Sequence, residues 1–139
     1  MLVRQFENKY FNKKTLESSQ KNTIVELSFE FALEIIEFSE LLESLKKIVI
    51  ARQLLKSGTS IGANVREAQS AESRADFVHK IKIAAKEAEE TEYWLLLCQQ
   101  AKNYPNCESL LQKINIICKI ISKIISSTKS NSKISSMAH

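Results

Sequence analysis

Glycine and proline are nearly absent from this chain, and their scarcity limits the fold more than any other feature of the sequence. The 139 residues include two glycines and one proline. A protein built from sheets needs such residues at most of its turns, so an all-β fold is excluded. The apolar residues recur instead at helical spacing. The sequence therefore predicts an all-α class within a single domain.

Both glycines fall in one stretch, residues 57–68, which has helical sequence on either side. Glycine in a helix interior costs about 1 kcal/mol relative to alanine, so two glycines here indicate a packing or functional reason. A loop between two helices is one interpretation. However, apolar and small residues recur at spacings of three and four, at Ala51, Leu54, Gly58, Ile61, Val65 and Ala68. This pattern favours one continuous helix with a small-residue face that lets another backbone come close.

Four amphipathic segments follow one another along the chain, each preceded by a residue suited to cap a helix. They run from a cap at Thr23 to about residue 42, from a cap at Ser44 to about 70, from a cap at Ser73 to the break at Pro105, and from a cap at Asn106 to about 125. Short connections make an antiparallel up-down-up-down four-helix bundle the expected architecture. The first and fourth helices are apolar over more than one stripe, so we also expect self-association.

The domain organisation expected from these segments is simple. Residues 1–22 are predicted to be a flexible N-terminal extension, because their apolar residues show no sustained period. Residues 23–128 form the bundle domain. Residues 129–139, which are mostly Ser, Lys and Asn, are predicted to be a disordered tail.

The net charge of +4 is unevenly distributed along the chain. Residues 24–45 contain six glutamates and no basic residue, whereas residues 46–57 contain four basic residues and no acidic one. A basic surface allows contact with the phosphates of RNA or DNA. The candidates for such contacts are Arg52, Lys56, Arg66, Arg74 and Lys80. The same residues can instead be solvated or paired with the glutamates of the first helix, and both interpretations stay open.

Catalytic and metal-binding patterns are sparse. A di-iron bundle needs Glu-x-x-His on two helices, but the chain has a comparable spacing once, at Asp76 and His79, and its other histidine is His139. No metal or other cofactor is therefore expected. Arg74 and His79 form an Arg-x4-His pattern that resembles the signature of the HEPN ribonucleases. Five residues turn an α-helix by about 140°, so the two side chains would not share a face. We expect no enzyme activity, with a ribonuclease as the less favoured alternative.

The three cysteines, Cys98, Cys107 and Cys118, are odd in number and form no C-x-x-C pair. They are expected to be core thiols in a reducing compartment. No apolar run approaches the roughly 18 residues of a membrane-spanning helix, and the first residues lack the apolar core of a signal peptide. We therefore expect a soluble cytoplasmic protein with no membrane partner.

Residues 52–68, RQLLKSGTSIGANVREA, resemble the signature of the four-helix bundle proteins known as 23S rRNA intervening-sequence proteins, or S23 ribosomal proteins. Shorter matches occur at 28–32, 76–80, 86–88 and 92–95, and the resemblance covers about residues 22–129. It implies a bacterial bundle assembled into a ring-like homopentamer with no defined catalytic residues. It also implies kinship with an accessory protein that binds nucleic acid and a reverse transcriptase.

These observations together predict a non-enzymatic accessory protein that associates with RNA. The alternative is a structural or protein-docking oligomer that binds no nucleic acid. Helix or oligomer packing is assigned to Gly58, Ile61, Gly62 and Trp94. Asn64 joins the basic residues as a candidate for nucleic-acid binding.

Overall fold

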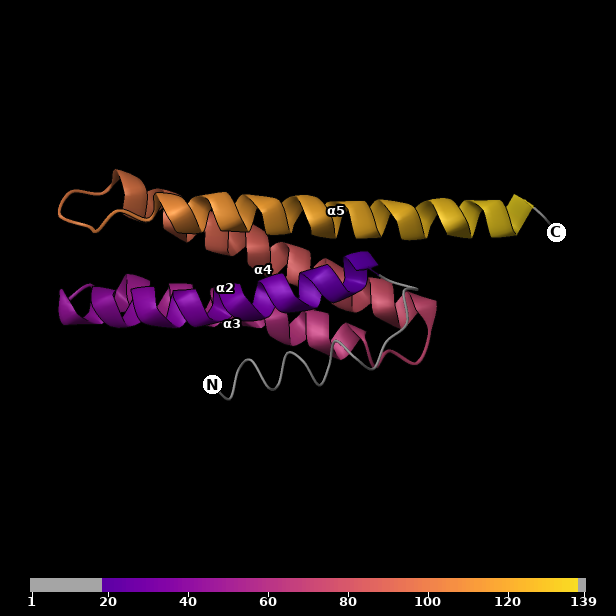
Figure 1. The fold of residues 1–139 in the computed structure, drawn as a ribbon, viewed down its shortest axis with the longest axis horizontal. Helices are drawn as coiled ribbons and strands as arrows, with labels where there is room; N and C mark the ends of the chain where they lie inside the picture. The colour runs from indigo at the N-terminus through magenta and orange to yellow at the C-terminus, as the bar shows by residue number, and fades with distance from the viewer. Residues whose placement is uncertain (1–18, 138–139) are drawn as a thin grey trace.

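The computed structural model describes residues 19–137, and this part of the chain contains four α-helices and no strand (Figure 1). The helices are α2 (Ser19–Ser44), α3 (Ile48–Ala68), α4 (Arg74–Gln100) and α5 (Glu108–Met137). The predicted all-α class is therefore confirmed. The sequence of α3 includes both glycines, neither of which has a positive φ, so the prediction of one continuous helix through residues 57–68 is also confirmed.

Two of the predicted helix caps are present. The hydroxyl of Ser73 accepts a hydrogen bond from the backbone N–H of Asp76 (3.0 Å), and the side chain of Asn106 accepts one from the N–H of Glu108 (2.8 Å). Each bond satisfies a backbone donor that the first turn of a helix leaves without an intrahelical partner.

The turn between α2 and α3 differs from the prediction. Ser44 does not cap the second helix, because it is the last residue of α2 and its hydroxyl donates to the carbonyl oxygen of Leu41 (2.6 Å). The chain reverses at Lys46, whose φ of 66° lies in the left-handed region. The N–H of Lys47 then donates to the carbonyl of Leu42 (2.8 Å), which closes the end of α2.

The helices also extend beyond the expected boundaries. Thr23 lies inside α2, which begins at Ser19, so it is not a helix cap. At the other end α5 continues to Met137 and so includes most of residues 129–139, which were expected to be a disordered tail. Once a helix is nucleated, each further residue adds one hydrogen bond, so a polar segment can continue a helix that packing has already fixed. Residues 1–18, the greater part of the predicted N-terminal extension, lie outside the described residues.

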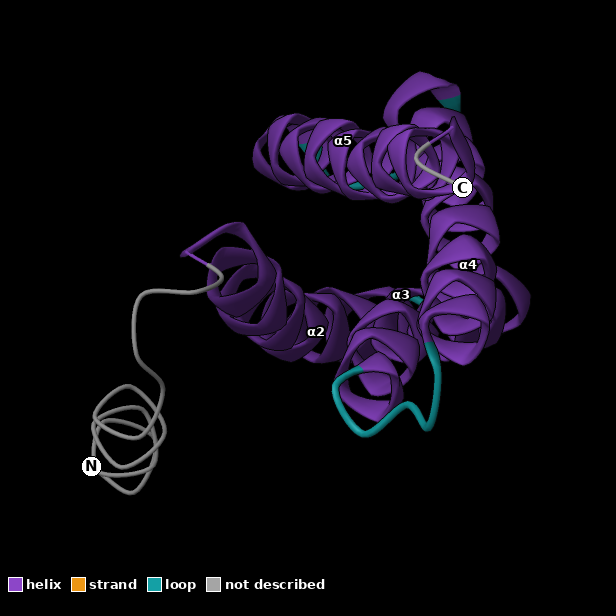
Figure 2. Ribbon diagram, turned by 90° about the vertical axis from the view of Figure 1, so that its right-hand side faces the viewer, coloured by secondary structure: helices purple, strands orange, loops and turns teal. Residues whose placement is uncertain are grey.

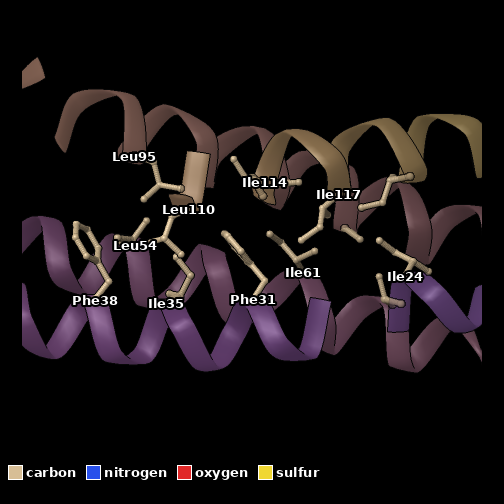
Figure 3. Packing of buried hydrophobic residues seen from close by; sticks show 14 of the residues in the cluster. Ile24, Phe31, Ile35, Phe38, Leu54, Ile61, Leu95, Leu110, Ile114 and Ile117 are labelled. Atoms are coloured by element: carbon tan, nitrogen blue, oxygen red, sulfur yellow. The ribbon is translucent and has the colours of Figure 1, made fainter. Parts of the chain in front are cut away.

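Each helix packs against two others around one core. Contacts join α2 to α3, α3 to α4, α4 to α5 and α5 to α2, and the contact between α2 and α5 is the least extensive (Figure 2). The core is made of buried aliphatic and aromatic side chains from all four helices. Phe31, Ile35, Leu54, Ile61, Leu95 and Ile114 are among them and point into the space between the helices (Figure 3).

The two glycines lie on the side of α3 that packs against α2. A Cβ atom at Gly58 would stand 2.8 Å from Cγ2 of Ile35, and one at Gly62 would stand 3.2 Å from the backbone oxygen of Ser28. On the side of α3 toward α4, the hydroxyls of Thr91 and Ser57 form a buried hydrogen bond (2.9 Å). At these positions α3 contacts α2 through glycines, which have no side chain, and contacts α4 through a pair of hydroxyls that are hydrogen-bonded to each other.

Candidate functional site

The side of α3 that faces away from the core carries three of the predicted nucleic-acid contacts. Arg52, Lys56 and Arg66 are all exposed, whereas residues between them such as Leu54 and Ile61 are fully buried. With a rise of about 1.5 Å per residue, Arg52 and Arg66 are about 21 Å apart along the helix axis. We refer to Arg52, Lys56 and Arg66 as the α3 basic row.

The other three predicted contacts are placed differently. Lys80 of α4 forms an ion pair with Glu67 of α3 (3.1 Å), so its charge is partly compensated. The side-chain amide of Asn64 is half-buried and donates to the carbonyl oxygen of Ser60 (2.8 Å), within its own helix. Arg74 is exposed at the first residue of α4 and makes no ion pair with the residues that the structure describes.

Acidic residues border the α3 basic row on the side toward α4. Burial, followed by the neighbouring Glu90 carboxylate, raises the pKa of Glu87, while Lys56 acts in the opposite direction. Lys56 therefore lies close enough to Glu87 to influence it. Glu67 and Glu87 therefore place negative charge beside the basic residues of α3 and α4.

The residues assigned to packing fall into two groups. Gly58 and Gly62 face α2, and Ile61 is fully buried, so these three contribute to packing within one subunit. Trp94 is half-buried on α4, where its indole N–H donates to Oε1 of Glu90 (3.4 Å). Its ring lies 5.4 Å from that of Tyr93 at 58°, the tilted arrangement that aromatic pairs favour.

Exposed apolar side chains on α4 are a feature that the sequence analysis missed. Tyr93, Leu96 and Leu97 are 56%, 46% and 39% exposed. The signal was the uninterrupted run of three leucines at 95–97, because a helix buried on one side cannot turn three consecutive side chains inward. We refer to Tyr93, Leu96 and Leu97 as the α4 apolar row.

No catalytic arrangement is evident among the described residues. Arg74 and His79 are both exposed and belong to one regular helix, so their side chains diverge by about 140° around its axis. Within the residues that the structure describes, no group of three or more His, Cys, Asp or Glu side chains is placed to hold a metal ion. Burial raises the pKa of Cys98 and Cys118 to about 11, which disfavours the reactive thiolate. Among the described helices, none is long and apolar enough to cross a membrane.

Comparison with known proteins gives one consistent result. Residues 20–125 match the family model described as 23S rRNA-intervening sequence protein. The chain is also similar to the crystal structure of a protein of unknown function from the S23 ribosomal protein family of Bacteroides thetaiotaomicron VPI-5482. The two share 43% sequence identity and a TM-score of 0.73, and the match covers 77% of this chain and 98% of the other. A search among curated proteins found no match.

Proposed function

Because the chain belongs to the 23S rRNA-intervening sequence protein family, we propose that it is a non-enzymatic, homo-oligomeric accessory protein that associates with RNA. The observation that carries the proposal is the α3 basic row. Arg52, Lys56 and Arg66 project from one side of a rigid helix and span about 21 Å, a length that several consecutive phosphates of an RNA helix can follow. Contacts with phosphates position the RNA backbone on the protein but do not distinguish one base sequence from another.

The expected binding is weak and salt-dependent. Three cations contacting phosphates give a slope of log affinity against log salt of about −2 to −3. Glu67 and Glu87 lie beside the basic residues of α3 and α4, which limits the contact to a narrow strip. The proposal therefore predicts a low-affinity RNA contact for each subunit, which an oligomer strengthens by presenting several copies.

A gel-shift titration of the full chain with a structured rRNA fragment tests this proposal. Arg52→Glu with Lys56→Glu should weaken binding by about tenfold or more at 50 mM salt. Lys119→Glu with Lys123→Glu is the matched control, because it makes the same charge change at two exposed residues of α5 and should bind nearly as the parent does. No binding by the parent at 50 mM salt would refute RNA association.

Assembly is the second part of the proposal. We infer an up-down-up-down bundle that forms a ring-like homo-oligomer, with a pentamer as the state that the family resemblance implies. The α4 apolar row supports self-association, because soluble monomers seldom leave neighbouring large apolar side chains this exposed. Light scattering should give a mass near five times the 15.8 kDa of one chain. A single-chain mass at about 10 µM protein would overturn the assembly.

A structural or protein-docking oligomer that binds no nucleic acid is the second candidate function. Two observations favour it: the ion pair between Glu67 and Lys80, and the position of Lys56 beside Glu87, each of which reduces the positive charge available to phosphate. For this candidate, Arg52→Glu with Lys56→Glu should leave activity in the cell unchanged.

A ribonuclease using Arg74 and His79 is the least favoured alternative, and His79→Ala tests it. If purified protein cleaves RNA and the substitution abolishes cleavage, the non-enzymatic proposal is wrong.

The proposed association with RNA also implies that the protein works in the cytoplasm, where RNA partners are found.

A further inference from the structure

The outer side of α2 carries a second exposed apolar stripe, separate from the α4 apolar row. Phe29, Leu33 and Ile36 are 37%, 39% and 38% exposed. Their spacings of four and three residues place them on one side of the helix, one above another. The core residues Phe31 and Ile35 belong to the opposite side of the same helix and are completely buried. α2 is therefore apolar on two sides, and only one of them is covered by the bundle.

Glutamates flank this stripe along its length. Glu26, Glu30, Glu37 and Glu40 are all exposed, and none of them forms an ion pair with the residues whose side chains the structure describes. Glu34, by contrast, is paired with Lys113 of α5. Like charges three or four residues apart destabilise a helix by about 0.2–0.5 kcal/mol per pair. We call Phe29, Leu33, Ile36 and these four unpaired glutamates the α2 outer face.

The chain itself contains a segment with complementary chemistry directly before α2. Residues 1–18 contain four basic residues, Arg4, Lys9, Lys13 and Lys14, against two acidic ones. Three aromatic residues, Phe6, Tyr10 and Phe11, lie between the basic ones. Aromatic side chains can cover the apolar stripe while the basic side chains reach the glutamates.

We propose that residues 1–18 dock on the α2 outer face of their own subunit. The segment is long enough, because Phe29 and Ile36 lie about 15 and 25 Å along the helix from Ser19, whereas 18 residues extend up to about 60 Å. Attachment to the start of α2 also gives the segment an effective concentration in the millimolar range, which favours its own subunit over a free partner.

This docking is a property of this chain and not of the family fold. The family model begins at residue 20, so residues 1–18 lie ahead of the matched region. The inference also stands apart from the proposed RNA association, because the α3 basic row and the α2 outer face share no residue. Either proposal can fail without the other.

Photo-cross-linking in the full chain tests the docking. A benzoylphenylalanine in place of Tyr10 keeps an aromatic side chain in the segment and reacts with whatever lies within a few ångströms of it. Unlabelled chains carrying the photo-reactive residue are refolded together with a large excess of ¹⁵N-labelled chains that retain Tyr10, so that any contact between subunits falls mainly on a labelled chain. Mass spectrometry of the cross-linked peptides then identifies both the helix and the molecule reached.

We expect adducts on residues 26–40 of the same unlabelled chain. Glu30→Lys with Glu37→Lys should lower their yield by about fivefold, because each reversal replaces an attraction with a repulsion. Glu89→Lys with Glu92→Lys is the control, since it makes the same charge change on α4 and should leave the yield unchanged. Adducts mainly on another helix, mainly on ¹⁵N-labelled chains, or in equal yield from the Glu30/Glu37 variant would each overturn the proposal.

Discussion

At residue 58, helix propensity favours a side chain, whereas the close approach of α3 to α2 leaves little room for one. Alanine in place of Gly58 should stabilise the helix by about 1 kcal/mol, since alanine has the higher helix propensity. However, the new Cβ would stand 2.8 and 2.9 Å from Cγ2 and Cγ1 of Ile35. Favourable carbon–carbon separations are about 3.5–4.0 Å, so one helix must shift or Ile35 must leave its rotamer. Ile35 is β-branched and fully buried, so it has little freedom to move.

Overpacking of this kind typically costs about 1–3 kcal/mol. Subtracting the gain in helix propensity leaves Gly58→Ala less stable than the parent by about 1 kcal/mol. Gly62→Ala is the matched control, because its Cβ would lie 3.2 Å from the Ser28 carbonyl oxygen, which needs a shift of only a few tenths of an ångström. We expect Gly62→Ala to lie within about 0.5 kcal/mol of the parent, since the two terms nearly cancel.

Urea unfolding followed by circular dichroism at 222 nm measures these differences, with all variants at one chain concentration because association changes apparent stability. A double-mutant cycle with Ile35→Ala isolates the contact, since it removes both Cγ atoms. Gly58→Ala should be better tolerated in the Ile35→Ala background than in the parent, with a coupling energy of about 1–2 kcal/mol. A Gly58→Ala variant more stable than the parent, or a coupling energy near zero, would show that the two helices are not this close.

Three further measurements test other parts of the fold. Ser73→Ala removes the cap of α4 and should lower the free energy of unfolding by about 1 kcal/mol in the same urea assay. Lys46→Gly should raise it by about 0.5–1 kcal/mol, because Lys46 has a φ of 66° and glycine adopts this conformation without strain. The raised pKa values of Cys98 and Cys118, about 11, mean that the folded state holds these protons more tightly than the unfolded state. Their contribution to stability is complete below pH 9 and is lost toward pH 11, so replacing both with alanine should flatten the fall in stability over that range.

Local patterns in the sequence were sufficient to predict the number and order of the helices, but not all of their ends. The spacing of small and apolar residues predicted one continuous helix that includes both glycines. Ser73 and Asn106, whose side chains can accept hydrogen bonds from backbone N–H groups, indicated where two helices begin. The turn after α2 was misplaced because Lys46 adopts a left-handed conformation that carries no sequence signal in a lysine. Asn103 has the same φ of 66°, but asparagine adopts it more readily, and Pro105, two residues later, already indicated a break in the helix.

The functional surfaces were harder to predict, because they depend on which helices become neighbours. Lys80 and Glu67 are 13 residues apart in sequence, and their ion pair exists only because the end of α3 packs beside the start of α4. Asn64 looked like a functional position from sequence, yet its amide donates into its own helix. The exposure of Leu96 and Leu97 depends on how α4 is rotated toward the core, which an unbroken leucine run leaves undetermined.

The proposed RNA association and the proposed docking of residues 1–18 together give one prediction about the charges on α2. α3 packs beside α2, and helix diameters of about 10 Å put phosphates bound along the α3 basic row roughly 20 Å from glutamates such as Glu30 and Glu37, inside the roughly 30 Å Debye length of 10 mM salt. At that distance each glutamate–phosphate pair costs about 0.2 kcal/mol in water. Two glutamates and three phosphates make six such pairs, so removing both charges should strengthen RNA binding by about 1 kcal/mol, or about fivefold, if nothing neutralises them. If residues 1–18 dock on the α2 outer face, their basic side chains already neutralise these glutamates. Glu30→Gln with Glu37→Gln should then change RNA affinity in the full chain by less than about twofold. A gain of about fivefold in a gel shift at 10 mM salt would mean that these glutamates are unpaired in the intact protein, and the docking of residues 1–18 would then be wrong.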